Sequence, residues 1–381
     1  MTRIDLIDFY FHVLPHRKKL EPPTTHAIGA IVAVNDNFTC YAIKMVAFSR
    51  PIRLLCSIAS SAAVNSFQLP ASTPLNAALQ LATEAFVAAA VPEPALSAEH
   101  LLTRCAGFGN DRRQLTLHAS EPLDEAAARA FECMCTRRFE RVPVQYILGD
   151  WDFHDLTLEM RPPVLIPRPE TEELVEHVLA ALGDDHRTGG RGAWRSSEID
   201  ILDVGCGTGA IGLALLNRLP NARCVGIDIC PTAHALSKAN AERCGLSARY
   251  ESLLVDGGIA ACDLAPRRFD VIVSNPPYIP RADMATLEPE VAWHEDAGAL
   301  CGGSDGLDVV RELLLATPRL LRTDGPRSIW LEVDTSHPPA IERWLGKQPA
   351  LGLQMVRWMR DAYGRPRFCE IGHTASHIAR T

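Results

Sequence analysis

Four residues in the second half of the chain carry the clearest chemical signal. They are Asn275, Pro276, Pro277 and Tyr278, and they follow an apolar run, residues 269–274, that is typical of a buried β-strand. Each proline fixes φ and lacks an N–H donor, so the turn is stiff and its carbonyls can point outward. The side-chain oxygen of Asn275 and the carbonyl of Pro276 can then accept both hydrogens of an –NH2 group, and Tyr278 offers a flat wall for a planar amide or base. Such a turn can present an amino group to a methyl donor, although taken alone it fits a proline-stiffened surface turn equally well.

A second signal lies upstream, where the apolar run 201–204 leads into a glycine-rich turn and then into a predicted helix. The turn consists of Gly205, Cys206, Gly207, Thr208 and Gly209. Glycine lets the backbone approach a ligand without a Cβ clash, and the start of a helix offers free N–H groups. Asp203, just before the turn, could hold the ammonium group of an amino-acid moiety. The spacing of Gly207, Gly209 and Gly212 is also that of G-x-G-x-x-G, so a nicotinamide-dependent dehydrogenase is an alternative at this point.

Two acidic residues end the next two predicted strands. Asp228 follows the apolar run 225–227, and in nucleoside-binding folds such an acid takes the ribose hydroxyls. Asp256 follows residues 250–255 and could contact an adenine edge, or could be a solvated acid at a strand end. The order glycine turn, acid, acid, Asn-Pro-Pro-Tyr resembles class I methyltransferases that depend on S-adenosylmethionine. This resemblance implies S-adenosylmethionine as the cofactor.

Further sequence blocks extend the resemblance from about residue 75 to about residue 372. They are Val144–Gly149, Leu165–Glu172, Glu290–Asp296, Gly302–Asp308 and Asp361–Phe368. These blocks are similar to the HemK/PrmC family of protein-(glutamine-N5) methyltransferases, which act on peptide-chain release factors. The first block with Trp151–Phe153, together with Leu331–Asp334, is particularly similar to the animal mitochondrial branch. The resemblance implies N5-methylation of the glutamine of a Gly-Gly-Gln motif in a release factor.

The resemblance also implies roles for individual residues. The glycine turn and its flanking acids would hold the cofactor, and Asn275 would contact both cofactor and substrate. The residues that would bind the cofactor are Asp203, Gly205, Cys206, Gly207, Thr208, Gly209, Asp228, Asp256 and Asn275. The substrate amide would lie on Asn275–Tyr278. Arg168 and Glu170 would close over cofactor and substrate, or would form a salt bridge that stabilises their loop. Family members often carry an aromatic residue after the third acid, whereas Gly257 and Gly258 follow Asp256 here, so this segment is not expected to stack on adenine.

The closest alternative function is methylation of N6 of adenine or N4 of cytosine in nucleic acid, because those enzymes share an Asn/Asp-Pro-Pro-Tyr turn. The net charge of the chain is −8. Residues 1–74 hold seven Lys/Arg and four Asp/Glu, so their net charge is +3 and that of residues 75–381 is −11. An acidic body argues against sequence-neutral nucleic-acid binding, which depends on Lys/Arg contacts to phosphates. The second alternative, a nicotinamide-dependent dehydrogenase, would not explain the Asn-Pro-Pro-Tyr turn. A third alternative is a non-catalytic binding protein that keeps the fold as a scaffold.

Composition limits the remaining classes. The twelve cysteines include no CxxC pair and the histidines show no HExxH spacing, so we predict reduced thiols and no metal site. We interpret Cys206 as a small filling residue rather than a nucleophile. No apolar run approaches the roughly 18 to 20 residues that span a bilayer, so no membrane segment is expected.

The predicted fold is α/β: a Rossmann-like methyltransferase domain with a mostly parallel seven-stranded sheet and a C-terminal antiparallel hairpin, preceded by a small helical domain and a β-hairpin connector. The helical domain is expected over residues 73–142, with helices beginning near Thr73 and over 95–107 and 121–141. The connector is expected over 143–168, with its turn at Gly149–Asp150, and the methyltransferase domain over 169–375. By resemblance, the helical domain helps to hold the release factor.

Residues 1–72 are predicted to be disordered. Between Asn37 and Thr83 there is no Asp or Glu, and residues 45–66 mix Arg, Ser and apolar residues, as mitochondrial targeting segments do. We therefore expect a mitochondrial location, with the cytoplasm as the alternative. Because this segment is internal, translation could begin at Met45, or residues 1–44 could come from an alternative first exon.

Overall fold

The computed structural model describes residues 27–34, 40–46, 67–185, 190–191, 198–322 and 327–374, and for residues 27–34, 40–46, 184–185, 190–191 and 261 it describes the backbone alone. The chain forms two compact units, residues 1–62 and residues 63–381. In the first unit, β1 (Ala27–Val34) and β2 (Cys40–Val46) pair as antiparallel strands. β1 consists of Ala, Ile, Val and Gly, and β2 has the sequence Cys-Tyr-Ala-Ile-Lys-Met-Val. The disorder of residues 1–72 stays a prediction. Residues 47–66 of the targeting-like segment lie outside the described residues.

The second unit begins with a helical domain of four helices. They are α3 (Leu75–Ala88), α4 (Pro94–Cys105), α5 (Arg113–Leu117) and α6 (Glu125–Phe139). Their core buries Phe86, Leu101 and Phe131. The Asp124 side chain caps α6 by accepting from the backbone N–H of Ala127. The short helix α5 was not predicted.

The helical domain also includes residues upstream of the boundary we predicted at 73. The ring of Phe67 contacts the ring of Phe131 edge-on, with centroids 6.2 Å apart. The backbone N–H of Leu69 donates to Glu132 Oε1 at 2.6 Å. The described part of this domain therefore extends back to residue 67.

The connector differs from the predicted hairpin in its first part. Val144–Leu148 is a short helix, α7, and Gly149 ends it in the left-handed conformation with φ 82°. The hairpin follows as β3 (Asp150–Phe153) and β4 (Leu156–Glu159), and it turns between Phe153 and Leu156 rather than at Gly149–Asp150. Pro143 before α7 and Gly149 after it are helix start and stop signals, which the sequence analysis read as strand and turn.

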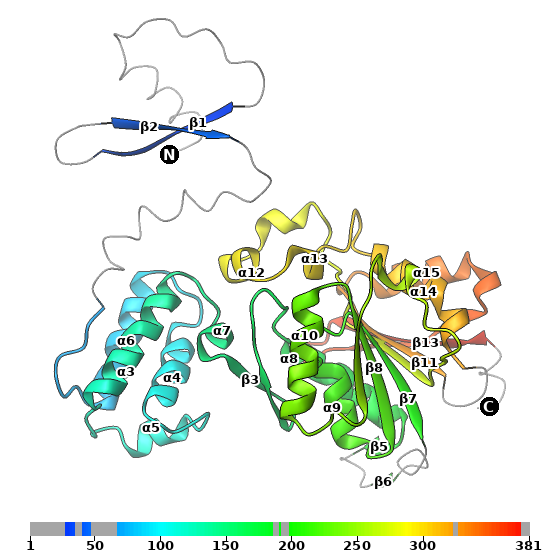
Figure 1. The fold of residues 1–381 in the computed structure, drawn as a ribbon, viewed down its shortest axis with the longest axis horizontal. Coiled ribbons are helices and arrows are strands. Elements are labelled where there is room, and N and C mark those ends of the chain that lie inside the picture. The colour runs from blue at the N-terminus through cyan, green and yellow to red at the C-terminus, as the bar shows by residue number, and fades with distance from the viewer. Residues whose placement is uncertain are drawn as a thin grey trace, which may run out of the picture. The chain divides into compact units, whose positions relative to one another are not determined.

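The remaining residues build the predicted seven-stranded sheet (Figure 1), in the order β12-β13-β11-β10-β7-β8-β9. The strands are β7 (Ile199–Val204), β8 (Ala222–Asp228), β9 (Tyr250–Leu254), β10 (Val271–Ser274), β11 (Ser328–Glu332), β12 (Leu353–Arg360) and β13 (Pro366–His373). The first five are parallel, and β13 is antiparallel to both β11 and β12. A two-residue antiparallel pair, β5 (Asp184–Asp185) with β6 (Gly190–Arg191), precedes β7 in the chain.

Helices cover both faces of the sheet, as Figure 1 shows. One face packs against α8 (Pro169–Ala181), α9 (Ala210–Arg218) and α10 (Pro231–Arg243). The other packs against α14 (Asp308–Leu320), α15 (Pro338–Gly346) and the short α11 (Gly258–Ala261). Successive residues of β7 alternate between the two cores: Ile201 lies in the first and Leu202 in the second. Strands buried on both faces explain the continuous apolar runs in the sequence.

The parallel register brings the strand ends into one row. Val204 pairs with Ile227 on one side and with Ser274 on the other, and Ser274 pairs with Leu331. The next residues along these four strands, at one edge of the sheet, are Gly205, Asp228, Asn275 and Glu332. The edge that carries the glycine turn therefore also carries the Asn-Pro-Pro-Tyr turn.

A buried ion cluster joins the helical domain to the segment that follows this turn. Glu290, on α12 (Pro289–His294), accepts from Arg138 Nη1 at 2.8 Å and from Arg141 Nε and Nη2 at 2.6 and 2.7 Å. Arg138 is 4% exposed and also donates to Ser97 Oγ and to the carbonyls of Pro92 and Val142. The cluster fixes α12 against the end of α6.

Among the described residues no helix is long and apolar enough to span a membrane.

Replacing Glu290 by Ala is expected to lower the free energy of unfolding by about 3 kcal/mol, because the Arg138 guanidinium stays buried without its carboxylate. Urea unfolding followed by circular dichroism measures the change. Glu288→Ala is the matched control: this side chain is exposed and caps nothing, so a change below about 0.5 kcal/mol is expected. Equal effects of the two substitutions would contradict a stabilising role for the cluster.

Candidate active site

The Asn-Pro-Pro-Tyr turn leaves the sheet directly after β10. The last residue of that strand, Ser274, is fully buried and donates from Oγ to the carbonyl of Val204 at 2.7 Å, which ties the turn to β7. Asn275 is half-buried. Burial, together with the nearby Glu332 carboxylate, raises the pKa of the Tyr278 hydroxyl to about 12, so this side chain stays neutral at physiological pH.

The side chain of Asn275 has one hydrogen-bond partner among the described residues. Its Nδ2 donates to Thr171 Oγ1 at 3.2 Å, and Thr171 Oγ1 donates to Glu332 Oε2 at 2.8 Å. Asn275 Oδ1 is thereby left as the acceptor that a ligand can use. Sequence reasoning did not select Thr171 or Glu332. The signal for Glu332 was present, because an acid at the end of an apolar strand is the same pattern that selected Asp228.

A cavity of about 220 Å³ lies beside the turn. Its lining residues are Leu165, Arg168, Asn275, Pro276, Tyr278, Ile279, Leu287, Val291, Ala299 and Leu300. Most of this lining is apolar, and the polar groups are the Asn275 amide, the Tyr278 hydroxyl and the Arg168 guanidinium. Such a cavity suits a side chain with an apolar stem and a neutral polar end.

The two loop residues predicted to close over the site have different surroundings. Arg168 lines the cavity and donates to both carboxylate oxygens of Glu295, at 2.8 and 2.7 Å. Glu295 is itself buried, so this ion pair fastens the loop before α8 to the segment that follows the turn. Glu170 does not line the cavity and pairs with Arg365 of the β12–β13 hairpin at 3.3 Å.

The glycine turn has the open geometry that a bound ligand requires. Gly205 and Gly207 have φ values of 70° and 55°, which side chains adopt at a cost. A Cβ on Gly205 would meet no atom within 4 Å, so the backbone faces open space. Gly209, in contrast, is closely packed against Leu213 and Ser237. Thr208 and Cys206 are buried, and burial raises the pKa of the Cys206 thiol, consistent with a filling role.

Two carboxylates hold this turn in shape. Asp228 Oδ2 accepts from the backbone N–H of Gly207 and its Oδ1 from that of Cys230, both at 2.9 Å. Asp203 Oδ2 accepts from the backbone N–H of Gly212 at 3.0 Å, and its Oδ1 is buried with no hydrogen-bond partner among the described residues. Burial raises the pKa of Asp203 to about 7 and also raises the pKa of Asp228. Both acids therefore shape the turn through its backbone N–H groups.

The third predicted acid is less engaged than the other two. Asp256 is exposed, just beyond the end of β9. Ile229, directly after Asp228, is 60% exposed and was not predicted as a site residue. An apolar side chain left in solvent beside a candidate ribose-binding acid offers a surface for an adenine ring. The orphaned Asp203 oxygen, the open face of Gly205 and exposed Ile229 together fit an adenosyl amino acid.

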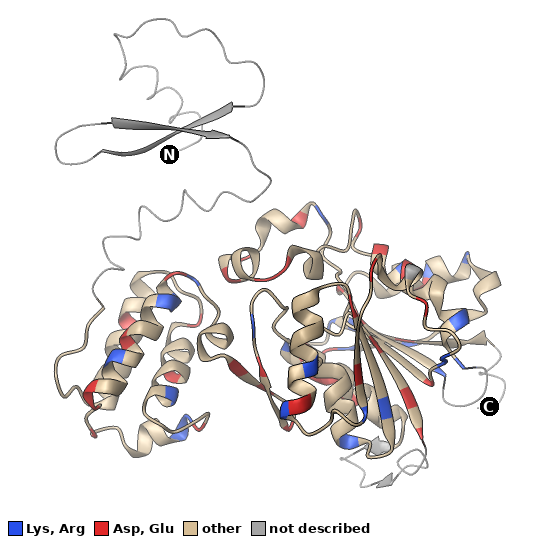
Figure 2. Cartoon of the chain, in the orientation of Figure 1, with Lys and Arg blue, Asp and Glu red and all other residues tan. Residues whose placement is uncertain are grey.

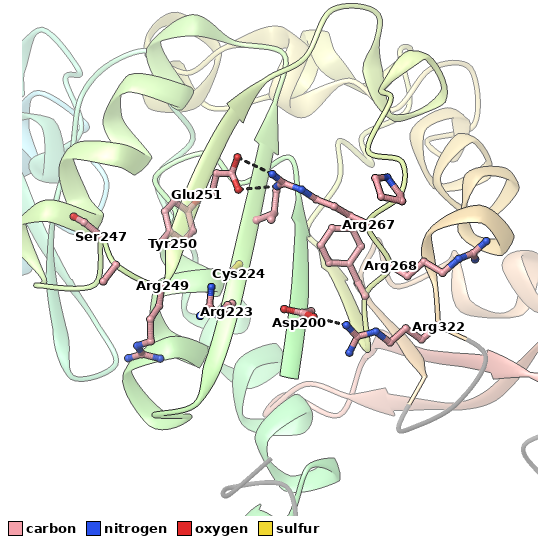
Figure 3. Close-up of a pocket in the computed structure, with 14 residues that line it drawn as sticks. Asp200, Arg223, Cys224, Ser247, Arg249, Tyr250, Glu251, Arg267, Arg268 and Arg322 are labelled. Atoms are coloured by element: carbon pink, nitrogen blue, oxygen red, sulfur yellow. Dashed lines mark hydrogen bonds and ion pairs between the residues drawn. The ribbon is translucent and has the colours of Figure 1, made fainter. Parts of the chain in front are cut away.

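A larger cavity, of about 700 Å³, lies at the opposite, amino ends of β7, β8 and β9 (Figure 3). Three of the arginines that line it have partners within the protein. Arg267 pairs with Glu251 and Arg322 pairs with Asp200, while Arg249 donates to carbonyls at the end of α9. Because ligands of open parallel sheets bind at the carboxyl ends of the strands, the cavity beside Asn275 is the candidate active site.

Charged residues and potential metal ligands give no competing site. Acidic and basic residues are interspersed on the helical domain and on the helices of the sheet in the view of Figure 2. The ten cysteines whose side chains are described are free thiols. Within the described ranges, no group of three or more His, Cys, Asp or Glu side chains could hold a metal ion.

Comparisons with known proteins agree with this geometry. Residues 77–149 match the family described as "PrmC N-terminal domain", and residues 201–293 match "Methyltransferase domain". The MTRF1L release factor glutamine methyltransferase of Homo sapiens is 40% identical over 303 residues, which cover 78% of this chain and 88% of the relative. This chain belongs to the release factor glutamine methyltransferase family.

Bacterial family members match to a similar extent. The release factor glutamine methyltransferase of Geobacter sulfurreducens is 40% identical over 275 residues, covering 72% of this chain and 83% of the relative. That of Mycolicibacterium smegmatis is 37% identical over 312 residues, covering 81% of this chain and 100% of the relative. The predicted family and the predicted S-adenosylmethionine-dependent domain are thus confirmed, and the dehydrogenase alternative is set aside.

The packing beneath the glycine turn yields a testable prediction. A Cβ on Gly226 would lie 2.2 Å from Tyr250 Oη and 2.9 Å from its Cζ, and Tyr250 is buried. Gly226→Ala is therefore expected to destabilise the protein by about 1–3 kcal/mol, because Tyr250 must move, and to weaken S-adenosylmethionine binding, because the added Cβ would also lie 3.1 Å from Cβ of Cys206 in the glycine turn. Urea unfolding and calorimetric titration measure the two effects.

Tyr250→Phe provides the control for this prediction. It removes the hydroxyl that makes the shortest contact, so the double variant Gly226→Ala/Tyr250→Phe is expected to recover part of the lost stability. A double variant no more stable than Gly226→Ala would show that the hydroxyl is not the obstacle.

Proposed function

We propose that this protein transfers a methyl group from S-adenosylmethionine to the side-chain nitrogen of the glutamine in the Gly-Gly-Gln motif of a peptide-chain release factor. The observation that carries the proposal is the Asn275 amide. Its nitrogen is engaged by Thr171, so its oxygen is available to accept an N–H in a small cavity of mostly apolar lining. A glutamine side chain has the matching form, an apolar stem that ends in an –NH2 group.

The chemistry that the site must perform is mainly positioning. A glutamine nitrogen is a poor nucleophile, because its lone pair is delocalised into the carbonyl. Two acceptors, Asn275 Oδ1 and the Pro276 carbonyl, can hold the two N–H hydrogens and bias the nitrogen towards a geometry in which its lone pair points away from them. Orientation of two bound reactants can contribute up to ~7–11 kcal/mol. The same acceptors favour the positive charge that develops on the nitrogen.

The cofactor, when bound, supplies an electrophilic methyl group on a sulfonium whose charge is neutralised by the transfer. The residues that would hold it are those of the glycine turn and its flanking acids. Asp203 would face the methionine part, Asp228 the ribose hydroxyls, and Asp256 with Ile229 the adenine. The turn and Asn275 lie at adjacent strand ends of the sheet, which supports a cofactor and substrate held side by side.

The partner is proposed to be held by more than the cavity. The helical domain is tied to α12 through Glu290, and Val291 of α12 lines the cavity. A release factor that contacts the helical domain could therefore be aligned with the cavity at a fixed distance. The names of the relatives state a release factor as their substrate, and this supports the same partner here.

We further propose that the protein acts in mitochondria. The resemblance of Val144–Phe153 and Leu331–Asp334 to the animal mitochondrial branch supports this, as does the Arg- and Ser-containing, acid-free segment 45–66.

A fluorescent protein fused to the C-terminus of the chain should accumulate in mitochondria and should lose that location when residues 45–66 are deleted. An unchanged distribution of fluorescence after the deletion would refute the proposal that residues 45–66 direct the protein to mitochondria.

The function is tested by transfer of labelled methyl from S-adenosylmethionine with the full chain, a mitochondrial release factor and, in parallel, DNA. Label is expected on the release factor and is expected to disappear when the glutamine of its Gly-Gly-Gln motif is replaced by Ala. Label on DNA instead would support an amino-methyltransferase of nucleic acid. Cofactor binding without transfer to either would support a scaffold.

Two substitutions should separate the substrate and cofactor roles. Asn275→Ala is expected to lower kcat by about 10²- to 10³-fold with S-adenosylmethionine affinity nearly unchanged, because it removes an acceptor that acts on the reacting nitrogen. Asp228→Asn is expected to raise the Kd for S-adenosylmethionine by about ten-fold or more, since a charged acceptor for hydroxyls is lost. Steady-state kinetics and calorimetric titration check both, and an Asn275→Ala enzyme with near-normal turnover would refute the mechanism.

A further inference from the structure

Two buried side chains form a row of hydrogen bonds that ends at Asn275 in the Asn-Pro-Pro-Tyr turn. Thr171 lies in the first turn of α8 and is 3% exposed, and Glu332 is the last residue of β11 and is fully buried. We propose that Thr171 and Glu332 are positioning residues that determine which way round the Asn275 amide lies, so that its oxygen and not its nitrogen faces the substrate. This inference rests on the proposed function, since it concerns the same amide.

With Glu332 ionised, the hydrogen-bond inventory allows one arrangement. An ionised carboxylate only accepts, so Glu332 Oε2 takes the single hydroxyl proton of Thr171, at 2.8 Å. The Thr171 oxygen is then left with lone pairs alone and must accept from whatever faces it. Asn275 can donate to this oxygen only through its NH2 group, which lies 3.2 Å from Thr171 Oγ1. Its Oδ1 therefore points away from Thr171.

The orientation matters because the two ends of an amide are nearly identical in shape and opposite in polarity. With Oδ1 towards the cavity, Asn275 accepts an N–H of the substrate amide. With the amide reversed, two N–H donors would face each other, and the pull on the reacting nitrogen would be lost. Shape alone cannot select between these states, so the selection must come from the far side of Asn275.

The surroundings of Glu332 act on its ionisation in both directions. The charged or titratable groups near it come from three elements: Arg367 on β13, Arg168 and Glu170 at the start of α8, and Tyr278 after β10. Its Oε1 has no hydrogen-bond partner among the described residues. Burial raises the pKa of Glu332 to about 7, and Thr171, Arg367 and Arg168 oppose that shift.

The first test replaces Thr171 by Val, which has nearly the same shape but no hydroxyl. Against a methyl group neither end of the Asn275 amide has a partner, so the amide is no longer held with Oδ1 towards the cavity and kcat should fall about ten-fold or more. The KM for S-adenosylmethionine and the melting temperature should match those of Thr317→Val, the control. Thr317 is a buried threonine of α14 that donates to the carbonyl of Leu313.

Thr171→Ser is the variant that restores the hydroxyl. It should recover turnover to within about three-fold of the unmodified protein, because Ser has the same donor and acceptors. Turnover of Thr171→Val equal to that of Thr317→Val would overturn the proposal. So would a Thr171→Ser enzyme as slow as Thr171→Val, since the hydroxyl would then be irrelevant.

The second test uses Glu332→Gln and pH. A protonated Glu332 or a Gln can donate to Thr171, which then can donate to Asn275 Oδ1 and stabilise the reversed amide. Glu332→Gln no longer imposes one orientation, so it should be slower than the unmodified protein, and the double variant should be no slower than Thr171→Val. Since the selecting form is the carboxylate, the kcat ratio of the unmodified protein to Thr171→Val should be largest above pH 8 and should shrink as the pH falls through about 7.

These outcomes are separable from a failure of the proposed function. If the unmodified protein does not methylate the release factor, the proposed function fails. If it does, additive losses in the double variant or a kcat ratio independent of pH would overturn the positioning role. Those results would mean that Thr171 and Glu332 act through general stability and not through the amide of Asn275.

Discussion

The structure depends on the register of four parallel strands, β8, β7, β10 and β11. Side chains of a strand alternate between faces, so a slip of one residue would exchange the two cores and move every strand-end residue. Buried apolar residues on both faces, such as Ile201 on one and Leu202 on the other, prevent that slip. The register consequently places the glycine turn, Asp228, Asn275 and Glu332 in one row, and the candidate site is a property of that row.

Parts outside the sheet are fastened to this row by acidic residues held between distant segments. Glu290 connects α12 to the end of α6, and Glu295 connects the segment after the turn to Arg168. Buried ion pairs add little net stability over apolar packing, but a carboxylate left between fixed arginines permits few geometries. Such contacts suit a site that must keep the helical domain, the cavity and the loop before α8 in one alignment.

The proposed cofactor half and the proposed substrate half of the site are built on different principles. The glycine turn is shaped by backbone N–H groups that donate to Asp228 and Asp203, with Tyr250 packed tightly beneath Gly226. The substrate half is shaped by side chains that come from three segments far apart in the chain, namely Thr171, Asn275 and Glu332. The first half is therefore local and readable as a motif, and the second exists only in the folded protein.

The sequence by itself determined the strands of the sheet and indicated candidate chemistry at several of their ends. Apolar runs that end in Gly205, Asp228 or Asn275 predicted the sheet, the cofactor turn and the amide-binding turn, because periodicity and turn chemistry act over a few residues. It could not determine how residues on different elements combine. Val144–Leu148 is a helix that begins after Pro143 and ends at Gly149. Glu332 lies next to Asn275 in the row of strand ends because β10 and β11 pair in one register, and Thr171 joins them because α8 packs on the sheet. Hydrogen bonds across more than a hundred positions leave no local pattern in a sequence, so the tertiary structure alone decided which way Asn275 faces.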